Sequence, residues 1–246
     1  MKLIWKILIT LSALVVLLIA GFSIWAYTPA RPMAEAVVAL QPDAFVNVSS
    51  DGWVTFSPSK GTPETGIILY PGGRVNYRAY APIAHKLAAE GYLVALVPMP
   101  FNLAVFGSEK ADEVIDANPE INNWVIGGHS LGGAMAASYV YNNPGAVEGL
   151  VLLAAYPAGS QSLANSDVKV LSISGTLDGL ATPEKISTSV TLLPINTFFE
   201  DIKGGNHAQF GWYGSQPGDR PAEISREEQQ NIVLERIISF LDSLKN

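Results

Sequence analysis

The sequence predicts an α/β fold in which a mostly parallel, doubly wound sheet follows one N-terminal membrane helix. Three observations support this. The chain opens on a long uncharged apolar run; short apolar runs then alternate with helix-like segments from about residue 65 onward. This alternation is typical of parallel sheets covered by helices. Runs such as 150–153 are continuously apolar, as expected of strands that are buried on both faces.

Residues 1–27 are predicted to form a signal anchor. Lys2 and Lys6 precede an uncharged run that extends to Tyr27, and about 20 such residues suffice to cross a hydrocarbon core of roughly 30 Å. Trp25 and Tyr27 resemble an interfacial aromatic anchor. The lysines favour a cytoplasmic N-terminus, so we expect a single-pass protein of the cell membrane with its domain outside the cytoplasm. A cleaved signal peptide is the alternative, and the domain would then be secreted.

The remaining chain is predicted to be a tether over 28–42, which contains three prolines, and one domain over 43–246. Residues 28–246 carry 13 Lys and Arg against 22 Asp and Glu, a net charge of −9. Such an acidic domain is not expected to bind nucleic acid. The sequence has no cysteine and no phosphate-binding G-x-x-x-x-G-K motif. We therefore predict neither a metal nor a cofactor; the oligomeric state is left open.

The elements follow in order. Residues 45–48 and 53–56 flank Ser-Ser-Asp-Gly and predict a β-hairpin. Apolar runs predict strands at 66–70, 92–97, 123–127, 149–154, 168–174 and 196–202. Helical patterns predict helices at 80–90, 109–117, 131–142 and 183–190. A last helix is predicted after Ser225, whose spacing to Glu228 is that of a capping box.

The segment Gly128-His129-Ser130-Leu131-Gly132 lies between an apolar run and a run of small helix-forming residues. A G-x-S-x-G sequence at a strand-to-helix junction bends sharply and exposes the serine hydroxyl at the sheet edge. The glycines are required where strand and helix backbones approach closely. The pattern predicts that Ser130 is a nucleophile.

A serine nucleophile requires a base, because its hydroxyl is barely ionised at neutral pH. His207 lies in a glycine-rich loop after a late strand and can reach back to the sheet edge, so it is the predicted base. His85 is interpreted as a solvated histidine on a helix surface. His129, directly before the serine, is given a supporting or packing role.

The base in turn requires a carboxylate that orients its ring. Asp178 follows the predicted strand 168–174 and lies between the serine and the histidine in sequence, so it is the predicted acid. Asp201 is the rival, although it lies within the strand that leads to His207. Asp112 and Asp116 are interpreted as exposed helix residues.

An acyl-transfer site also needs donors for an oxyanion. The backbone N–H of Leu131, directly after the nucleophile, is the first predicted donor. The second is expected in the loop Pro71-Gly72-Gly73-Arg74 after an early strand. The N–H of Gly73 is preferred there, with Gly72 and Arg74 as alternatives.

Four motifs together resemble the α/β-hydrolase superfamily, and more narrowly the compact "alpha/beta hydrolase family 5" group of exported bacterial proteins. They are 70–73 with the downstream Tyr80-Ala81-Pro82, 128–133, 174–179 and 204–211. The resemblance implies an α/β-hydrolase fold in which Ser130 is the nucleophile, Asp178 the acid and His207 the base. No long insertion separates 154 from 168, so no large cap domain is expected.

Without a cap, the site is expected to be open. Aromatic residues could line it, namely Tyr156, Trp212 and Tyr213, with Phe101 and Phe106 beside them; ordinary packing is an equal alternative for each. The predicted activity is hydrolysis of a small-molecule carboxylic ester through an acyl-enzyme. Acyl transfer or amide hydrolysis would use the same triad, and a non-catalytic binding or scaffold domain on this fold is the alternative from another class.

Overall fold

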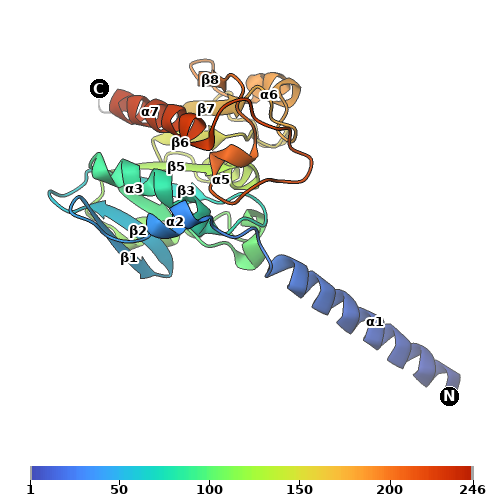
Figure 1. The fold of residues 1–246 in the computed structure, drawn as a ribbon. Coiled ribbons are helices and arrows are strands. Elements are labelled where there is room, and N and C mark those ends of the chain that lie inside the picture. Colours follow the sequence, from blue (N-terminus) through green and yellow to red (C-terminus); the bar gives the residue numbers. More distant parts are fainter. Residues whose placement is uncertain (1, 245–246) are drawn as a thin grey trace.

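The computed structural model describes residues 2–244 and shows one eight-stranded sheet covered by helices (Figure 1). Met1 of the predicted anchor and residues 245–246 of the predicted domain lie outside the described residues. The strands are β1 (Val46–Asp51), β2 (Trp53–Pro58), β3 (Thr65–Tyr70), β4 (Leu93–Leu96), β5 (Asn123–His129), β6 (Gly149–Leu153), β7 (Lys169–Gly175) and β8 (Phe198–Ile202). Each predicted strand is present; β1 ends three residues beyond its expected position, and every other strand end lies within two residues of it.

The strands lie in the order β1-β2-β4-β3-β5-β6-β7-β8. The predicted hairpin is formed by β1 and β2, which pair antiparallel around Gly52, and β2 joins the sheet antiparallel to β4. From β4 to β8 every pair is parallel. Tyr70 at the end of β3 is in register with Gly128 near the end of β5. This register sets the loop after β3 beside the G-x-S-x-G segment.

The longer helices are α1 (Lys2–Ala26), α2 (Ala34–Val38), α3 (Ala81–Ala89), α4 (Lys110–Ala117), α5 (Leu131–Asn142), α6 (Pro183–Ser189) and α7 (Arg226–Leu244). Short 3-10 turns are η1 (Tyr77–Tyr80), η2 (Pro100–Asn102), η3 (Ala104–Phe106), η4 (Val190–Leu192) and η5 (Ala208–Phe210). The predicted cap of α7 is formed, since the backbone N–H of Glu228 donates to Ser225 Oγ at 3.1 Å.

Alternate side chains of the parallel strands β3 to β7 enter two separate cores, as the two-residue repeat of a strand requires. Ile67 and Leu69 of β3 pack with α3 and α7, whereas Ile68 and Tyr70 pack on the opposite face with α4 and α5. Both faces of the central strands are therefore buried, which explains the continuous apolar runs of the sequence.

Helix α1 projects away from the domain as a single straight rod (Figure 1). Within residues 2–244 it is the one helix that is long and apolar enough to cross a membrane, and its apolar side chains are exposed along its length. The structure thus contains the expected apolar N-terminal helix.

The segment 28–42 lies on the domain surface instead of forming a free spacer. Ala30 forms an isolated parallel bridge with Val75, the N–H of Met33 donates to the carbonyl of Trp212 at 2.8 Å, and Ala36 of α2 is fully buried. The three prolines of this segment indicated a tether, but they are equally compatible with an ordered path, here including the short helix α2, that packs against the domain.

His85 holds the end of this segment, contrary to its interpretation as a solvated residue. Its Nδ1 lies 2.9 Å from the carbonyl oxygen of Ala39, and its Nε2 lies 3.1 Å from Asp43 Oδ2. The ring also packs edge-on against Phe56. The prediction was wrong because helix periodicity does not reveal that a distant segment covers this face of α3.

Candidate active site

Ser130 occupies a sharp turn between β5 and α5. Its backbone has φ 53° and ψ −121°, a conformation that costs an L-residue free energy and persists only where the surroundings impose it. The neighbouring glycines make the turn possible. A Cβ on Gly128 would lie 2.6 Å from the carbonyl carbon of Gly132, and a Cβ on Gly132 would collide with the carbonyl oxygens of Tyr70 and Pro71. The turn therefore has the geometry expected of a nucleophile elbow.

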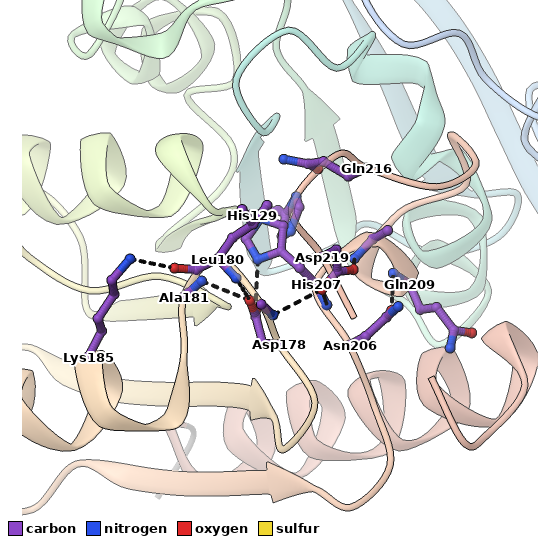
Figure 2. Close-up of polar contacts among 12 residues, drawn as sticks. His129, Asp178, Leu180, Ala181, Lys185, Asn206, His207, Gln209, Gln216 and Asp219 are labelled. Carbon is purple, nitrogen blue, oxygen red and sulfur yellow. Dashed lines mark hydrogen bonds and ion pairs between the residues drawn. The ribbon is translucent and has the colours of Figure 1, made fainter. Parts of the chain in front are cut away.

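The structure brings Asp178 and His207 together. His207 Nδ1 lies 2.8 Å from Asp178 Oδ2, and the two side chains are 1% and 0% exposed (Figure 2). The other carboxylate oxygen of Asp178 accepts the backbone N–H groups of Leu180 and Ala181, each at 2.7 Å. These bonds fix the carboxylate, which in turn fixes the imidazole. His207 Nε2 has no hydrogen-bond partner among the described residues.

The rival acid lies elsewhere. Asp201 Oδ1 accepts the hydroxyl of Ser174 at 2.6 Å on the exposed side of β8. The two helix aspartates, Asp112 and Asp116, are both exposed, as interpreted from the sequence, and Asp112 also accepts the hydroxyl of Tyr139 at 2.6 Å. None of the three bonds to His207. Among residues 2–244, no group of three or more His, Asp or Glu side chains could hold a metal ion.

Asp219 links the loops that carry Asp178 and His207, and sequence reasoning did not identify it. Its Oδ1 accepts the N–H of Gly179 at 3.1 Å and that of His207 at 3.2 Å, while its Oδ2 accepts the N–H of Ala208 at 2.8 Å (Figure 2). The residue sits in a Pro-Gly-Asp turn, whose local pattern indicates only a loop. Its role depends on contacts between segments that are far apart in the sequence.

Helix α7 supports the His207 loop from the other side. Gln229, fully buried, accepts the N–H of Asn206 and donates to its carbonyl, and Gln230 donates to the carbonyl of Gln209. Arg226 donates to the carbonyls of Ala208, Gly211 and Gly214. Gln229 and Gln230 lie four and three residues before Val233 of the predicted apolar face. This spacing is a sequence signal that could have pointed to the role, because amides that become buried require partners.

The loop after β3 supplies a free backbone donor. The N–H of Gly72 donates to Tyr80 Oη at 3.0 Å and that of Arg74 donates to the carbonyl of Asn102 at 2.8 Å. For Gly73 and Leu131, by contrast, the N–H has no acceptor within residues 2–244. The two residues are adjacent, since a Cβ on Gly73 would lie 3.2 Å from Leu131 Cδ2. Of the three residues considered in this loop, Gly73 is therefore the one whose donor remains available.

His129 is buried behind the site, consistent with a supporting or packing role. Its Nδ1 lies 2.8 Å from Tyr80 Oη, and its ring centroid lies 4.5 Å from that of His207. Since Tyr80 Oη accepts the N–H of Gly72, its own proton is free to be donated to His129 Nδ1. Burial, with the adjacent His207, holds the pKa of His129 well below its usual range, and burial raises the pKa of Tyr80.

Ser130 and His207 line the same cavity of about 280 Å³. The rest of the lining is mainly apolar, formed by Leu131, Ala134, Ala154, Ala155, Tyr156, Leu180 and Ala181. Tyr156 also lines a neighbouring cavity along α6. Among the aromatic residues expected near the site, it is the one that shares the cavity of Ser130.

The other aromatic residues expected near the site do not line this cavity. Trp212 and Tyr213 are only 7% and 6% exposed. Trp212 packs near Arg226, while the hydroxyl of Tyr213 donates to Gln216 and its ring lines a second cavity beside Gly73. Phe101 and Phe106 pack against each other, close to the C-terminal end of α1.

Residues 66–231 match the alpha/beta hydrolase family. This match covers most of the chain and every element that carries the candidate site. The chain belongs to the alpha/beta hydrolase family. This membership supports a hydrolase activity and agrees with the fold and with the resemblance noted in the sequence.

Comparison of this alpha/beta hydrolase with curated proteins gave no match. Solved structures are similar in fold. Carboxylesterase CesB (YbfK) from Bacillus subtilis has a TM-score of 0.59 at 14% identity, over 90% of this chain and 98% of that one. A "predicted CIB-like hydrolase" from Thermoplasma acidophilum has a TM-score of 0.57 at 16% identity, over 78% of this chain and 98% of that one. At these identities the likeness concerns the fold.

Proposed function

We propose that this alpha/beta hydrolase is a membrane-anchored serine hydrolase that cleaves carboxylic esters through an acyl-enzyme. The observation that carries the proposal is the bond between His207 Nδ1 and Asp178, because it leaves Nε2 as the basic atom of a histidine that lines the same cavity as Ser130. In the proposed reaction Ser130 is the nucleophile, His207 the base and Asp178 the orienting acid.

In the first half-reaction, His207 Nε2 takes the hydroxyl proton of Ser130 while Oγ attacks the ester carbonyl carbon. The carbonyl oxygen becomes negatively charged and is stabilised by the N–H groups of Leu131 and Gly73, neither of which has another acceptor among the described residues. When the intermediate collapses, the ester C–O bond breaks and the leaving alcohol takes the proton from His207.

In the second half-reaction, water gives a proton to His207 and its oxygen attacks the acyl-enzyme. The same two N–H groups stabilise the second oxyanion. Collapse releases the carboxylic acid and returns the proton to Ser130 Oγ. No cofactor takes part in this scheme. Throughout, Asp178 stabilises the protonated imidazole without taking its proton.

The proposed location is the cell membrane, crossed once by α1, with the domain outside the cytoplasm. The length and hydropathy of α1, together with Lys2 and Lys6 before the apolar run, support it. Ala26 is fully buried against the domain, which favours a retained anchor over a cleaved signal peptide. An Ile195→Cys variant tests the orientation, because the chain has no other cysteine and Ile195 is fully exposed. A membrane-impermeant maleimide should label it in intact cells, and labelling only after lysis contradicts the orientation.

A fluorophosphonate probe tests the chemistry on the full chain in detergent micelles. We expect labelling of the wild type and of Ser187→Ala, an exposed serine on α6 that serves as the matched control. Ser130→Ala should not be labelled, and it should lose turnover of short aryl esters. Labelling that persists in Ser130→Ala contradicts the assigned nucleophile. Absence of labelling and turnover in the wild type supports a non-catalytic binding domain.

A further inference from the structure

The outer end of α1 is bound to the loops that form the candidate active site. Arg74, the residue after Gly73, donates from Nε to the carbonyl of Trp25 at 3.0 Å and from a terminal nitrogen to the carbonyl of Thr28 at 2.8 Å. Asn102 donates to the carbonyl of Ala26 at 2.9 Å. These bonds satisfy carbonyls that the end of a helix leaves without intrahelical partners. They join the helix end to the domain without an intervening spacer.

The segment that follows α1 is also bonded to the domain. The N–H of Ala30 donates to the carbonyl of Arg74 at 2.7 Å, the N–H of Asn76 donates back to Ala30 at 3.0 Å, and Met33 is bonded to Trp212. A flexible segment of 15 residues would extend over roughly 20 Å and let the domain turn freely. Here the attachment begins at Trp25, within the last turn of α1, so the orientation of α1 sets the orientation of the domain.

Aromatic side chains of α1 and of the domain form one continuous surface at this junction. The ring centroid of Phe101 lies 5.6 Å from that of Phe22 and 5.8 Å from that of Tyr27. We call this surface the junction patch and define it as Phe22, Trp25, Tyr27, Phe101, Val105 and Phe106. Five of its members are exposed by 42% or more, an unusual concentration of apolar surface beside an acidic domain.

The length of α1 places this patch at the surface of a bilayer. From Lys6 to Ala26 the helix advances by 20 residues, or about 30 Å, which is the thickness of the hydrocarbon core. With Lys6 at the cytoplasmic boundary, Ala26 reaches the outer boundary. Aromatic side chains favour this depth. Val105 and Phe106 of η3 would then contact the outer leaflet, although they lie some 80 residues beyond the helix.

The same loops reach the candidate site. Arg74 is adjacent in sequence to Gly73, and a Cβ on Gly73 would lie 3.9 Å from Leu103 Cδ2, between η2 and η3. The cavity of Ser130 is lined largely by alanine and leucine, with no Lys or Arg among its lining residues. Leu131, which lines this cavity, lies beside Gly73, so the loop that holds α1 is also next to the cavity of Ser130.

We propose that the junction patch is embedded in the outer leaflet and that the substrate is a long-chain ester that reaches Ser130 from the bilayer. This inference rests on the proposed function, whose serine chemistry it takes as given. It adds that the substrate comes from the bilayer and that the junction patch is the surface in contact with it.

A first experiment measures the position of the patch without using activity. Because the chain has no cysteine, Phe106→Cys and Ile195→Cys each carry a single fluorescent label in the full chain, reconstituted in phosphatidylcholine vesicles. Phospholipids with bromine near the headgroup end of the acyl chain should quench the label at position 106 and leave the label at position 195 unchanged. Equal quenching at both positions, or none at 106, overturns the proposal.

A second experiment separates lipid-phase from soluble substrates. An aryl butyrate in solution and the same aryl palmitate dissolved in the vesicles are assayed with Val105→Ser/Phe106→Ser. The matched control is Ile195→Ser/Phe198→Ser, which changes an exposed aliphatic and an exposed aromatic residue near the β8 edge. We expect the patch variant to lose about tenfold in palmitate turnover, with butyrate turnover unchanged, and the control to change neither.

The outcomes distinguish this inference from the proposed function. If the wild type cleaves the butyrate but not the vesicle-bound palmitate, the lipid source is wrong and the serine hydrolase remains. If the patch variant lowers both activities equally, or neither, the patch does not deliver substrate. If the wild type cleaves neither ester and takes no fluorophosphonate, the proposed function itself fails.

Discussion

The ring of His129 lies against the ring of His207, with 4.5 Å between their centroids. Both imidazoles are buried, so two positive charges at this separation would be costly. The pKa of His129 is held well below its usual range by burial and by the neighbouring His207. His129 is therefore neutral, and in the proposed reaction His207 is the histidine that takes the proton of Ser130.

The first prediction concerns the pH dependence of stability. Native His129 stays neutral, whereas the unfolded chain binds a proton at this residue below about pH 6.5. The free energy of unfolding should therefore fall as the pH is lowered through that value, by at most about 1.4 kcal/mol per pH unit for this group. Urea unfolding of the full chain in detergent, followed by tryptophan fluorescence over a series of pH values, measures the slope.

His129→Asn is the matching variant, because its side-chain oxygen can still accept the hydroxyl of Tyr80. The smaller side chain leaves a cavity that lowers the free energy of unfolding at every pH. The comparison with the wild type therefore uses the change of this free energy with pH and not its absolute value. We expect a shallower slope than that of the wild type. An unchanged slope would show that His129 does not contribute to the acid sensitivity.

The second prediction concerns the orienting acid. Asp178→Asn should lower kcat/KM for a short aryl ester by about four orders of magnitude, because an amide can hold the imidazole in the wrong tautomer. Asp201→Asn is the control and should keep activity, since Asp201 bonds to Ser174 and not to His207. Steady-state kinetics on both variants decide between the two acids. Loss of activity in Asp201→Asn alone would reverse the assignment.

The third prediction concerns Asp219, which joins the loops of Asp178 and His207. Asp219→Ala leaves the N–H groups of Gly179, His207 and Ala208 without their acceptor. We expect a loss of about 2 to 3 kcal/mol in the free energy of unfolding, because the bonds are charge-assisted but Asp219 is partly exposed. Urea unfolding measures it, and ester kinetics should show a larger effect on kcat than on KM.

Asp116→Ala removes an exposed carboxylate and serves as the control for Asp219→Ala. It should change neither the free energy of unfolding nor turnover. If both variants behave alike, the contacts of Asp219 do not position the two loops.

The fourth prediction concerns the link between Tyr80 and the proposed oxyanion loop. Tyr80→Phe removes the hydroxyl that accepts the N–H of Gly72 and contacts His129. We expect kcat to fall about tenfold with little change in KM, since the loop would hold Gly73 less firmly in the transition state. Tyr77→Phe, in the same 3-10 turn, is the control and should behave as the wild type. A rise in KM without a fall in kcat would instead indicate a role in substrate binding.

Local sequence patterns were sufficient for the fold and for the order of the candidate site residues. Continuous apolar runs predicted strands that are buried on both faces. The glycines around Ser130 predicted a sharp turn, and in the structure a Cβ at these glycines would collide with backbone atoms. Both signals are local, because they arise from the strand repeat and from steric limits within a few residues. The choice of Gly73 also used only its position after an early strand.

Contacts between distant segments could not be derived in this way. Asp219, Gln229 and Arg226 hold the His207 loop, yet each lies in a segment with an ordinary turn or helix pattern. The sequence indicated a solvated His85, whereas in the structure Ala39 and Asp43 cover it. Trp212 and Tyr213 were expected near the site as aromatic residues, and only the fold showed how deeply they are buried.

The sequence by itself determined an apolar N-terminal helix, a parallel α/β sheet and a serine placed at a strand-to-helix elbow. Only the tertiary structure showed that His207 bonds to Asp178 and that Asp219 bonds to the loops of both residues. Only the tertiary structure showed that the end of α1 is bonded to the loop of Gly73. The physical reason is that strand and helix patterns arise from neighbours in the chain. Hydrogen bonds between loops depend on where the sheet brings each strand end in space.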